Sequence, residues 1–323
     1  MKNFVLLPAR SLEEAARASA RPDTELKAGG VDLIDRMKEG VDTPERIVSI
    51  AHLPGLNQIQ MGPPARIGAL TTLAAIAHDA DVRKTYPALA AAAEGAATPQ
   101  IRNMATLGGN ICQRPRCWYY RLSDFDCRKK GGNDCYAKEG ENRFHAIFDT
   151  DLLCVCVHPS ATAVALLAYG ADLELVTPSG RKKMSIDDLF VKPTTDPTEE
   201  NRLKAGEIIQ TVVLPAPASG SRSAYRKLKE KESFDWPLVE ACVAGSLSGG
   251  AIRQPRVVFG HVAQVPWRSK EAEKVLAGQA PSPEIFRKAA EAAVHSAKPL
   301  SQNAFKVRLA KVTLERTLKD AFA

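Results

Sequence analysis

Six of the seven cysteines in the sequence gather in one segment. They are Cys112, Cys117, Cys127, Cys135, Cys154 and Cys156. In a chain that starts without an export signal, such clustering favours metal or redox chemistry over a disulfide scaffold. The seventh, Cys242, stands alone in the apolar run LVEACVAG and is predicted to be a small buried hydrophobe.

The cysteine spacing favours one kind of metal centre over another. From Cys117 it reads C-x9-C-x7-C-x18-C and ends at Cys154. Zinc sites usually draw their ligands from two C-x2-4-C pairs; Cys112 and Cys117 have this spacing, and no second pair exists unless Cys154 and Cys156 serve as one. Four thiolates spread along a loop-rich segment favour an iron-sulfur cluster, because a bulky cluster can be held from separate directions. Bound zinc and uncoordinated thiols remain open alternatives.

Two glycine turns could bind a phosphate. KAGGVDLI (27–34) ends a predicted strand and opens a predicted helix, and ATLGGN (105–110) has the same build, with Thr106 and Asn110 beside its glycines. Adjacent glycines let successive N–H groups point at one spot, and a helix N-terminus adds partial positive charge. The turns could hold one diphosphate from two sides. Two unrelated turns are an equal alternative, since the G-x-G-x-x-G spacing is absent.

Composition excludes several classes of protein. The 323 residues carry 44 Lys+Arg and 37 Asp+Glu, a formal charge of +7, with 45% hydrophobic and 25% charged residues. These values are ordinary for a globular protein of two or three domains, and no apolar run is long enough to span a membrane. Scattered basic residues and only 6% aromatics argue against nucleic-acid binding. The histidines lack metal-site spacing, and no nucleophile-elbow or P-loop motif is present.

Alternating strands and helices must position these residues. At the start, FVLLP predicts a strand, Ser11 to Glu14 has capping-box spacing, and TELKAGG predicts a second strand before a helix over 31–38. The cysteine-rich segment has no clear periodicity, which is typical of a functional or metal-held loop. The other predicted elements are strands in 46–50, 66–71, 171–186, 206–215, 224–229, 238–247 and 255–263, and helices near 72–80, 87–97, 161–170 and from 269 onward.

These motifs, read together, resemble a known family. KAGGVDLI, TPQIRNMATLGGNICQRPRC, EGENRFHAIF, CVCVHPSA and YRKLKEKESFDWPLV follow in the order found in the FAD-binding subunit of the molybdenum hydroxylases, the xanthine dehydrogenase and aldehyde oxidoreductase family. The similarity covers essentially the whole chain. It is greatest to the bacterial three-subunit aldehyde oxidoreductases whose flavin subunit carries an extra [4Fe-4S] cluster.

The resemblance implies an α+β fold in which a two-subdomain FAD-binding unit of the vanillyl-alcohol-oxidase type precedes a carboxy-terminal α+β domain that covers the flavin. The implied limits are 1–55 for the first subdomain, 56–216 for the second, with an iron-sulfur insert at 111–158, and 217–323 for the last domain. PAPASGSRS (215–223), rich in Pro, Ser and Gly, is the best boundary signal in the sequence itself.

The resemblance also assigns site residues. No catalytic side chain is implied, since the chemistry would be the flavin's. The implied ligands of the [4Fe-4S] cluster are Cys117, Cys127, Cys135 and Cys154. The implied FAD-binding residues are Lys27, Ala28, Gly29, Gly30, Val31, Asp32, Leu33, Ile34, Thr106, Gly109, Asn110, Ser160, Ile209 and Lys227.

Two positions depart from the family pattern. Ala161 stands where the family usually has Asp after His-Pro-Ser, so a polar contact to the flavin end is missing or is supplied by Ser160 or Thr162. Phe234 stands in place of the usual Tyr and lacks its hydroxyl. The departure at Ala161 bears on flavin orientation or potential more than on binding.

The expected function is that of an electron-transfer subunit. A molybdopterin-containing large subunit would oxidise an aldehyde or N-heterocycle, a small subunit would pass the electrons through [2Fe-2S] clusters, and FAD on this chain would deliver them to an external acceptor. The complex would be cytoplasmic, or periplasmic if a partner carried an export signal. The alternatives are the flavin subunit of a 4-hydroxybenzoyl-CoA reductase-like complex, a stand-alone flavin oxidase, and a zinc-stabilised scaffold.

Overall fold

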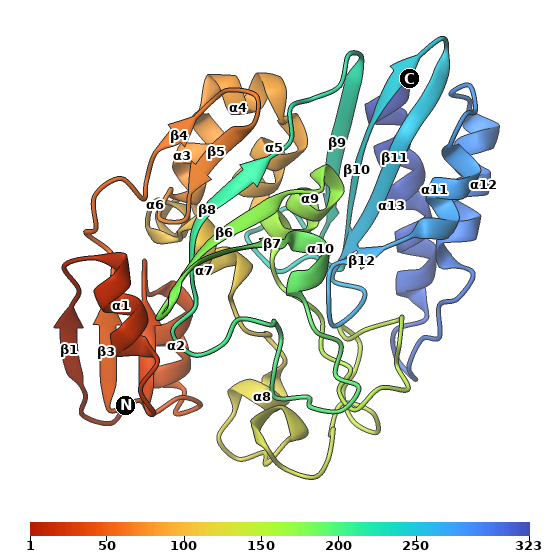
Figure 1. Ribbon diagram of the computed structural model, residues 1–323. Coiled ribbons are helices and arrows are strands. Elements are labelled where there is room, and N and C mark those ends of the chain that lie inside the picture. The colour runs from red at the N-terminus through yellow and green to blue at the C-terminus, as the bar shows by residue number, and fades with distance from the viewer.

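The structure, a computed structural model, describes all residues 1–323 and contains three β-sheets with helices packed against them (Figure 1). The amino-terminal sheet is parallel, with strand order β1-β3-β2. Helix α1 packs against β2 and β3, and Ser11 caps it by accepting a hydrogen bond from the Glu14 N–H, as the capping-box spacing predicts. The elements of this unit are β1 (Val5–Pro8), α1 (Leu12–Ser19), β2 (Thr24–Lys27), α2 (Val31–Lys38) and β3 (Arg46–Ser49).

The middle sheet is antiparallel and has the order β4-β5-β8-β6-β7, so its strands come from two stretches of the chain separated by many helices. Its strands are β4 (Ile59–Gln60), β5 (Ala65–Gly68), β6 (Asp172–Thr177), β7 (Gly180–Ser185) and β8 (Ile208–Leu214). The helices of this part are α3 (Leu73–His78), α4 (Ala80–Thr85), α5 (Pro87–Gly95), α6 (Pro99–Met104), α7 (Leu107–Ile111), α9 (Ala161–Tyr169) and α10 (Ile186–Leu189).

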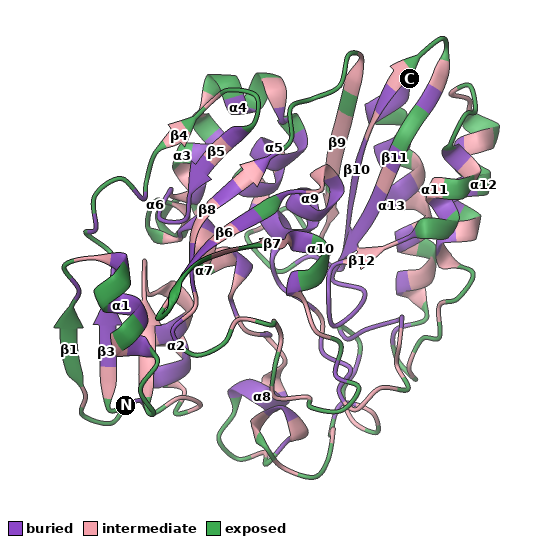
Figure 2. Cartoon of the chain, viewed as in Figure 1, coloured by how far each residue is buried: buried purple, intermediate pink, exposed green.

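Helix α9 is the centre of the largest core. It is apolar on every side and is buried along almost its whole length, as the run ATAVALLAY predicts (Figure 2). It packs against α5 on one side and against β10 and β11 of the third sheet on the other. The core therefore continues from the second unit into the third.

The carboxy-terminal unit is an antiparallel sheet, in the order β12-β11-β10-β9, with three helices packed together on it. Long apolar strands and the amphipathic periodicity near the end of the sequence predict this arrangement. Its elements are β9 (Ser221–Leu228), β10 (Val239–Ser248), β11 (Ala251–Gly260), β12 (Trp267–Arg268), α11 (Lys270–Leu276), α12 (Pro283–Val294) and α13 (Phe305–Phe322).

The cysteine-rich segment leaves the second unit after α7 and returns to it before α9. It holds only the short helices α8 (Trp118–Arg121) and η1 (Arg128–Lys130), in agreement with its lack of periodicity. In Figure 1 it lies below the rest of the molecule, between the amino-terminal unit and the carboxy-terminal helices. We call residues 112–158 the insert. Because regular structure is scarce there, hydrogen bonds and ion pairs to its neighbours must hold it.

The insert is bound on two sides. Toward the amino terminus, Arg114, Arg116 and Arg121 reach acidic side chains of α2 and of the loop after α10. Toward the carboxy terminus, the Asn142 side chain and the Gln302 N–H hydrogen-bond at 3.0 Å, and Asn303 Nδ2 donates to the Ala146 carbonyl at 2.9 Å. The insert therefore contacts both the amino-terminal and the carboxy-terminal unit.

Candidate functional site

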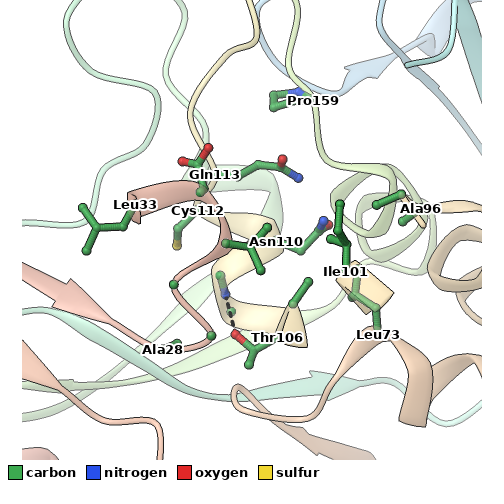
Figure 3. A pocket seen from close by; sticks show the side chains of 18 of the residues that line it. Ala28, Leu33, Leu73, Ala96, Ile101, Thr106, Asn110, Cys112, Gln113 and Pro159 are labelled. Atoms are coloured by element: carbon green, nitrogen blue, oxygen red, sulfur yellow. Dashed lines mark hydrogen bonds between the residues drawn. The ribbon is translucent and has the colours of Figure 1, made fainter. Parts of the chain in front are cut away.

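A cavity of about 580 Å³ lies where the three units meet. Its size is within the range of about 300–1,000 Å³ that is usual for cofactor sites. Close to it, Ala28 and Leu33 lie on the amino-terminal unit, Thr106 and Asn110 on α7, and Leu73, Ala96 and Ile101 on other helices of the second unit (Figure 3). Of the predicted FAD-binding residues, those that line it are Lys27, Ala28, Gly29, Gly30, Val31, Asp32, Leu33, Thr106, Gly109, Asn110, Ile209 and Lys227.

The two glycine turns meet at this cavity. A Cβ on Gly29 would overlap the Met104 carbonyl oxygen, so only glycine permits this close approach of the first turn to the segment before α7. Gly30 has φ 79° and occupies the N-cap position of α2 without a side-chain bond, which leaves the first N–H groups of α2 without helical partners. Of the two alternatives that the sequence leaves open, the structure favours the shared site.

Ile34 and Ser160 lie behind the cavity wall rather than in it. The Ile34 N–H donates to the Gly30 carbonyl at 2.9 Å inside α2, so it is not free to bind an anion. Ser160 is fully buried at the N-cap of α9 and donates to Asn110 Oδ1 at 2.7 Å. Thr162 donates to the same oxygen at 2.6 Å. Two donors on Oδ1 fix the orientation of the Asn110 amide and leave its Nδ2 as the end that can donate into the cavity.

Neighbouring hydrogen bonds hold the remaining predicted residues in place. Thr106 caps α7 and accepts from the Gly109 N–H at 3.2 Å, the bond drawn in Figure 3. Ile209 is a buried side chain of β8. Lys227 of β9 donates to the Gly95 carbonyl at the end of α5, and burial lowers the pKa of its ammonium below the usual value. A lysine so placed supplies positive charge to the cavity from the carboxy-terminal unit.

Asp32 sits at a convergence of arginines that the sequence did not predict. Its carboxylate lies 2.7 Å from an Nη of Arg121, 2.9 Å from an Nη of Arg116 and 3.1 Å from Nε of Arg36. Burial alone would raise the pKa of the Asp32 carboxyl, but Arg116, Arg121 and Arg36 outweigh it and hold the pKa below its ordinary value. The residue therefore anchors the insert on α2 as a carboxylate.

Five cysteines of the insert line a second, much smaller cavity. They are Cys117, Cys127, Cys135, Cys154 and Cys156, and we call their site the cysteine pocket. The four predicted ligands are thus brought together from separate stretches of chain, with Cys156 beside them, whereas Cys112 lies apart in the wall of the large cavity. The free volume of the cysteine pocket is about 10 Å³, so the sulfurs would have to move apart around a cluster. No group of three or more His, Cys, Asp or Glu side chains is arranged to hold a single metal ion.

The surroundings of the cysteine pocket keep its thiols neutral. Burial raises the pKa of the Cys117 thiol to about 12, and a hydrogen bond with Cys154 raises the pKa of Cys135 further above the usual value. His145 Nε2 lies 3.2 Å from the Cys117 sulfur, and burial lowers the pKa of this imidazole to about 4, so the ring is neutral. Thiolate ligation would therefore release protons as a metal centre formed.

Sequence reasoning missed several residues of the large cavity. Trp236, Glu240 and His261 of the carboxy-terminal unit line it. His261 and Glu240 are almost fully buried, with 4% and 1% of their surfaces exposed, although isolated histidines are most often structural. A polar residue inside the otherwise apolar strand LVEACVAG was the one available signal for Glu240, and nothing in the sequence marked His261. Cys242, by contrast, is fully buried in the core as predicted.

Comparison with known proteins identifies the family. Residues 2–217 match the FAD binding domain in molybdopterin dehydrogenase, and residues 223–321 match the CO dehydrogenase flavoprotein C-terminal domain. The chain belongs to the FAD-binding subunits of the molybdenum hydroxylases. Among relatives of this flavoprotein family, the aldehyde oxidoreductase FAD-binding subunit PaoB of Escherichia coli (strain K12) is 35% identical over 100% of this chain and 99% of its own length. The carbon monoxide dehydrogenase medium chain of Hydrogenophaga pseudoflava is 28% identical over 93% and 90%.

A solved structure agrees with this assignment. The carbon monoxide dehydrogenase of Hydrogenophaga pseudoflava that lacks the Mo-pyranopterin moiety superposes with a TM-score of 0.78 at 27% identity, over 99% of this chain and 97% of the other. The family resemblance, the α+β fold class and the assignment as an oxidoreductase subunit are thereby confirmed. The family binds FAD, and the large cavity is the site whose residues fit it.

Proposed function

We propose that this chain is the FAD- and [4Fe-4S]-containing electron-transfer subunit of a molybdenum-dependent aldehyde oxidoreductase-like complex. Its partners would be a molybdopterin-containing large subunit and a [2Fe-2S] small subunit, with an external electron acceptor docking at the flavin. The observation that carries the proposal is the meeting of both glycine turns at one cavity of about 580 Å³ in a chain that is 35% identical to PaoB along its whole length. The similarity to PaoB favours an aldehyde-oxidising complex over the other family activities.

The residues of the large cavity fit FAD by their chemistry. Bound FAD would accept electrons and pass them on. The first N–H groups of α2, Gly29 and the Nδ2 of Asn110 supply donors for the anionic diphosphate, and Lys227 adds positive charge. Ile209 and Ala161 supply apolar wall, so the polar contact that the family's usual Asp would make is absent at this position. Ser160 and Thr162 do not replace it, because both hydroxyls hold Asn110.

The cysteine pocket fits an iron-sulfur cluster by its donor set. Four thiols in the predicted spacing line one small cavity, and they come from a segment with little helix and no strand. Aromatic rings of Trp118, Tyr119 and Tyr136 pack around the pocket and limit the access of solvent. Thiolate ligands and exclusion of water are the features by which a protein binds and tunes such a cluster.

Cofactor analysis of the full chain, purified without oxygen, tests the proposal. We expect flavin absorbance together with about four iron and four acid-labile sulfide per chain. Cys135→Ala should lose the iron and keep FAD, whereas the matched variant Cys242→Ala, which removes a buried thiol outside the insert, should keep both. Zinc in place of iron, or the absence of flavin, would overturn the proposal.

Two further measurements test the identity of the fourth cluster ligand and the need for partner subunits. Cys154→Ala should lose iron while Cys156→Ala retains it, and the reverse result would move the fourth ligand to Cys156. An aldehyde should reduce the flavin only in the presence of the two partner subunits. Reduction of the isolated chain by a small organic substrate would instead identify a stand-alone oxidase.

A further inference from the structure

The large cavity contains a buried pair of titratable side chains that the flavin chemistry described so far does not use. Glu240 lies in β10, and His261 follows directly on the neighbouring strand β11. Glu240 Oε1 accepts a hydrogen bond from the Tyr225 hydroxyl at 2.6 Å, and Oε2 lies 3.3 Å from His261 Nδ1. A Cβ on Gly260 would overlap the Glu240 carboxylate, so this glycine makes room for the pair.

The pair is incompletely bonded within the protein. His261 Nδ1 and Nε2 and Glu240 Oε2 have no hydrogen bond of good geometry, although all three atoms are buried. A buried polar atom without a partner costs about 1–3 kcal/mol, so such atoms call for an explanation. Since both residues line the large cavity, a ligand there is the partner that could satisfy Nε2.

His261 is also held in an unfavourable backbone conformation. Its φ is 60°, in the left-handed region that few residues other than glycine adopt, although asparagine, aspartate and histidine adopt it more often than the rest. The fully buried Lys306 of α13 donates to the His261 carbonyl at 2.6 Å and to the His145 carbonyl at 2.8 Å. Strain kept by such a buried contact is commonly found where a side chain must be presented to a ligand.

The groups around the pair keep Glu240 ionised. Burial would raise the pKa of the Glu240 carboxyl, but His261, Tyr225 and Lys227 outweigh it, so that this pKa lies below its usual value. The charged and titratable groups that face the pair are Tyr225 and Lys227 of β9, His158, Lys306 of α13, and Arg116, whose guanidinium lies 5.0 Å from the centre of the Trp236 ring.

We propose that His261, held by Glu240, binds the isoalloxazine ring of FAD through its Nε2–H. The inference rests on the proposed function, which puts FAD in the large cavity with its flavin end against the carboxy-terminal unit. A hydrogen-bond donor at the ring favours the electron-rich reduced flavin over the oxidised form, so the His261–Glu240 pair raises the flavin potential. It supplies a polar contact on a wall where Ala161 supplies none.

The midpoint potential of the FAD in the full chain tests this assignment. His261→Asn keeps a side chain that tolerates positive φ but removes the imidazole and its Nε2–H donor. We expect it to retain FAD and to lower the midpoint potential by at least about 30 mV, which for two electrons is a tenfold change in the ratio of reduced to oxidised flavin. His295→Asn, which changes an exposed histidine, should leave the potential unchanged.

A double variant separates direct contact from the effect of a Glu240 carboxylate left without its partner. Glu240→Gln with His261→Asn removes the carboxylate together with the imidazole, and its oxidised-flavin absorption should still differ from wild type because the Nε2–H contact is gone. A potential of His261→Asn equal to that of His295→Asn, or a wild-type flavin spectrum in the double variant, would overturn the assignment. A wild-type chain without FAD would instead refute the proposed function itself, so the two failures are distinguishable.

Discussion

Asp32→Asn should destabilise the protein because it removes the negative charge on which three arginines converge. The Asp32 side chain is 13% exposed and faces Arg36, Arg116 and Arg121, and its carboxylate also accepts the Arg114 N–H at 3.0 Å. Asparagine has nearly the same shape and can still accept from that N–H. The substitution therefore isolates the charge.

The size of the destabilisation depends on the ion pairs that remain to the three arginines in the variant. Removing one partner of a buried ion pair costs about 3–5 kcal/mol. Arg36 retains its ion pair with Asp42, and Arg121 retains Glu39 at 3.1 Å. We therefore expect the lower end of that range, a decrease of about 3 kcal/mol in the free energy of unfolding.

Asp35→Asn is the matched control. Asp35 lies on the same helix and pairs with Arg116 at 2.9 Å, but its side chain is 48% exposed. An exposed pair contributes about 0–1 kcal/mol. Both variants should be unfolded in urea with the same FAD content, because bound ligand adds to stability. Equal unfolding free energies for Asp32→Asn and Asp35→Asn would refute the reasoning that the buried arginine cluster holds the insert on α2.

The pH dependence gives a second check on Asp32. Its pKa is lower in the folded protein than in the unfolded chain, where an aspartate has a pKa of about 3.9. The stabilisation is therefore fully present above about pH 4 and is lost as the pH falls through the folded pKa. Wild type and Asp32→Asn should accordingly converge only in acid, and a difference that vanished between pH 6 and 8 would contradict this account.

Two further substitutions test the cavity walls. Gly29→Ala places a Cβ on the Met104 carbonyl and should weaken FAD binding at least about tenfold, equivalent to about 1.4 kcal/mol, as measured by fluorescence titration. Gly62→Ala, at an open position, should leave FAD binding unchanged. Unchanged FAD affinity in Gly29→Ala would show that the two glycine turns need not touch. Lys306→Met leaves the carbonyls of Phe144, His145 and His261 without their buried donor and should lower the free energy of unfolding in urea by about 3–5 kcal/mol. Lys319→Met, which changes an exposed lysine on the same helix, should lower it by less than about 0.5 kcal/mol. Equal effects of the two substitutions would exclude a stabilising role for the buried Lys306 side chain.

Local patterns predicted most of the elements. Apolar alternation marked the strands, Ser11 marked a helix start, and the all-apolar run at 161–169 marked a buried helix. The short helices α6, α7 and α8 were not predicted, because elements of four to six residues have too little periodicity to be read from sequence.

The site was predictable where chemistry is local and not where it depends on long-range packing. Adjacent glycines and clustered cysteines can be recognised directly in the sequence. The ion pairs of Asp32 with Arg116 and Arg121 join residues more than 80 positions apart, and the contact of Glu240 with His261 depends on strand register. No local sequence pattern indicates that these residues lie close together, so both contacts became known only from the structure.

The arginines of the insert contact α2. On the other side, Asn142 of the insert contacts Gln302, and Lys306 donates to the carbonyl of His145 in the insert. The insert therefore borders both the amino-terminal and the carboxy-terminal walls of the FAD cavity. A centre assembled in the cysteine pocket would order the insert, and an ordered insert would fix both walls. Thermodynamic linkage then requires reciprocity, so that each cofactor raises the affinity of the protein for the other by the same factor. The Cys135→Ala variant should accordingly bind FAD more weakly than wild type, although it retains FAD when the flavin is saturating.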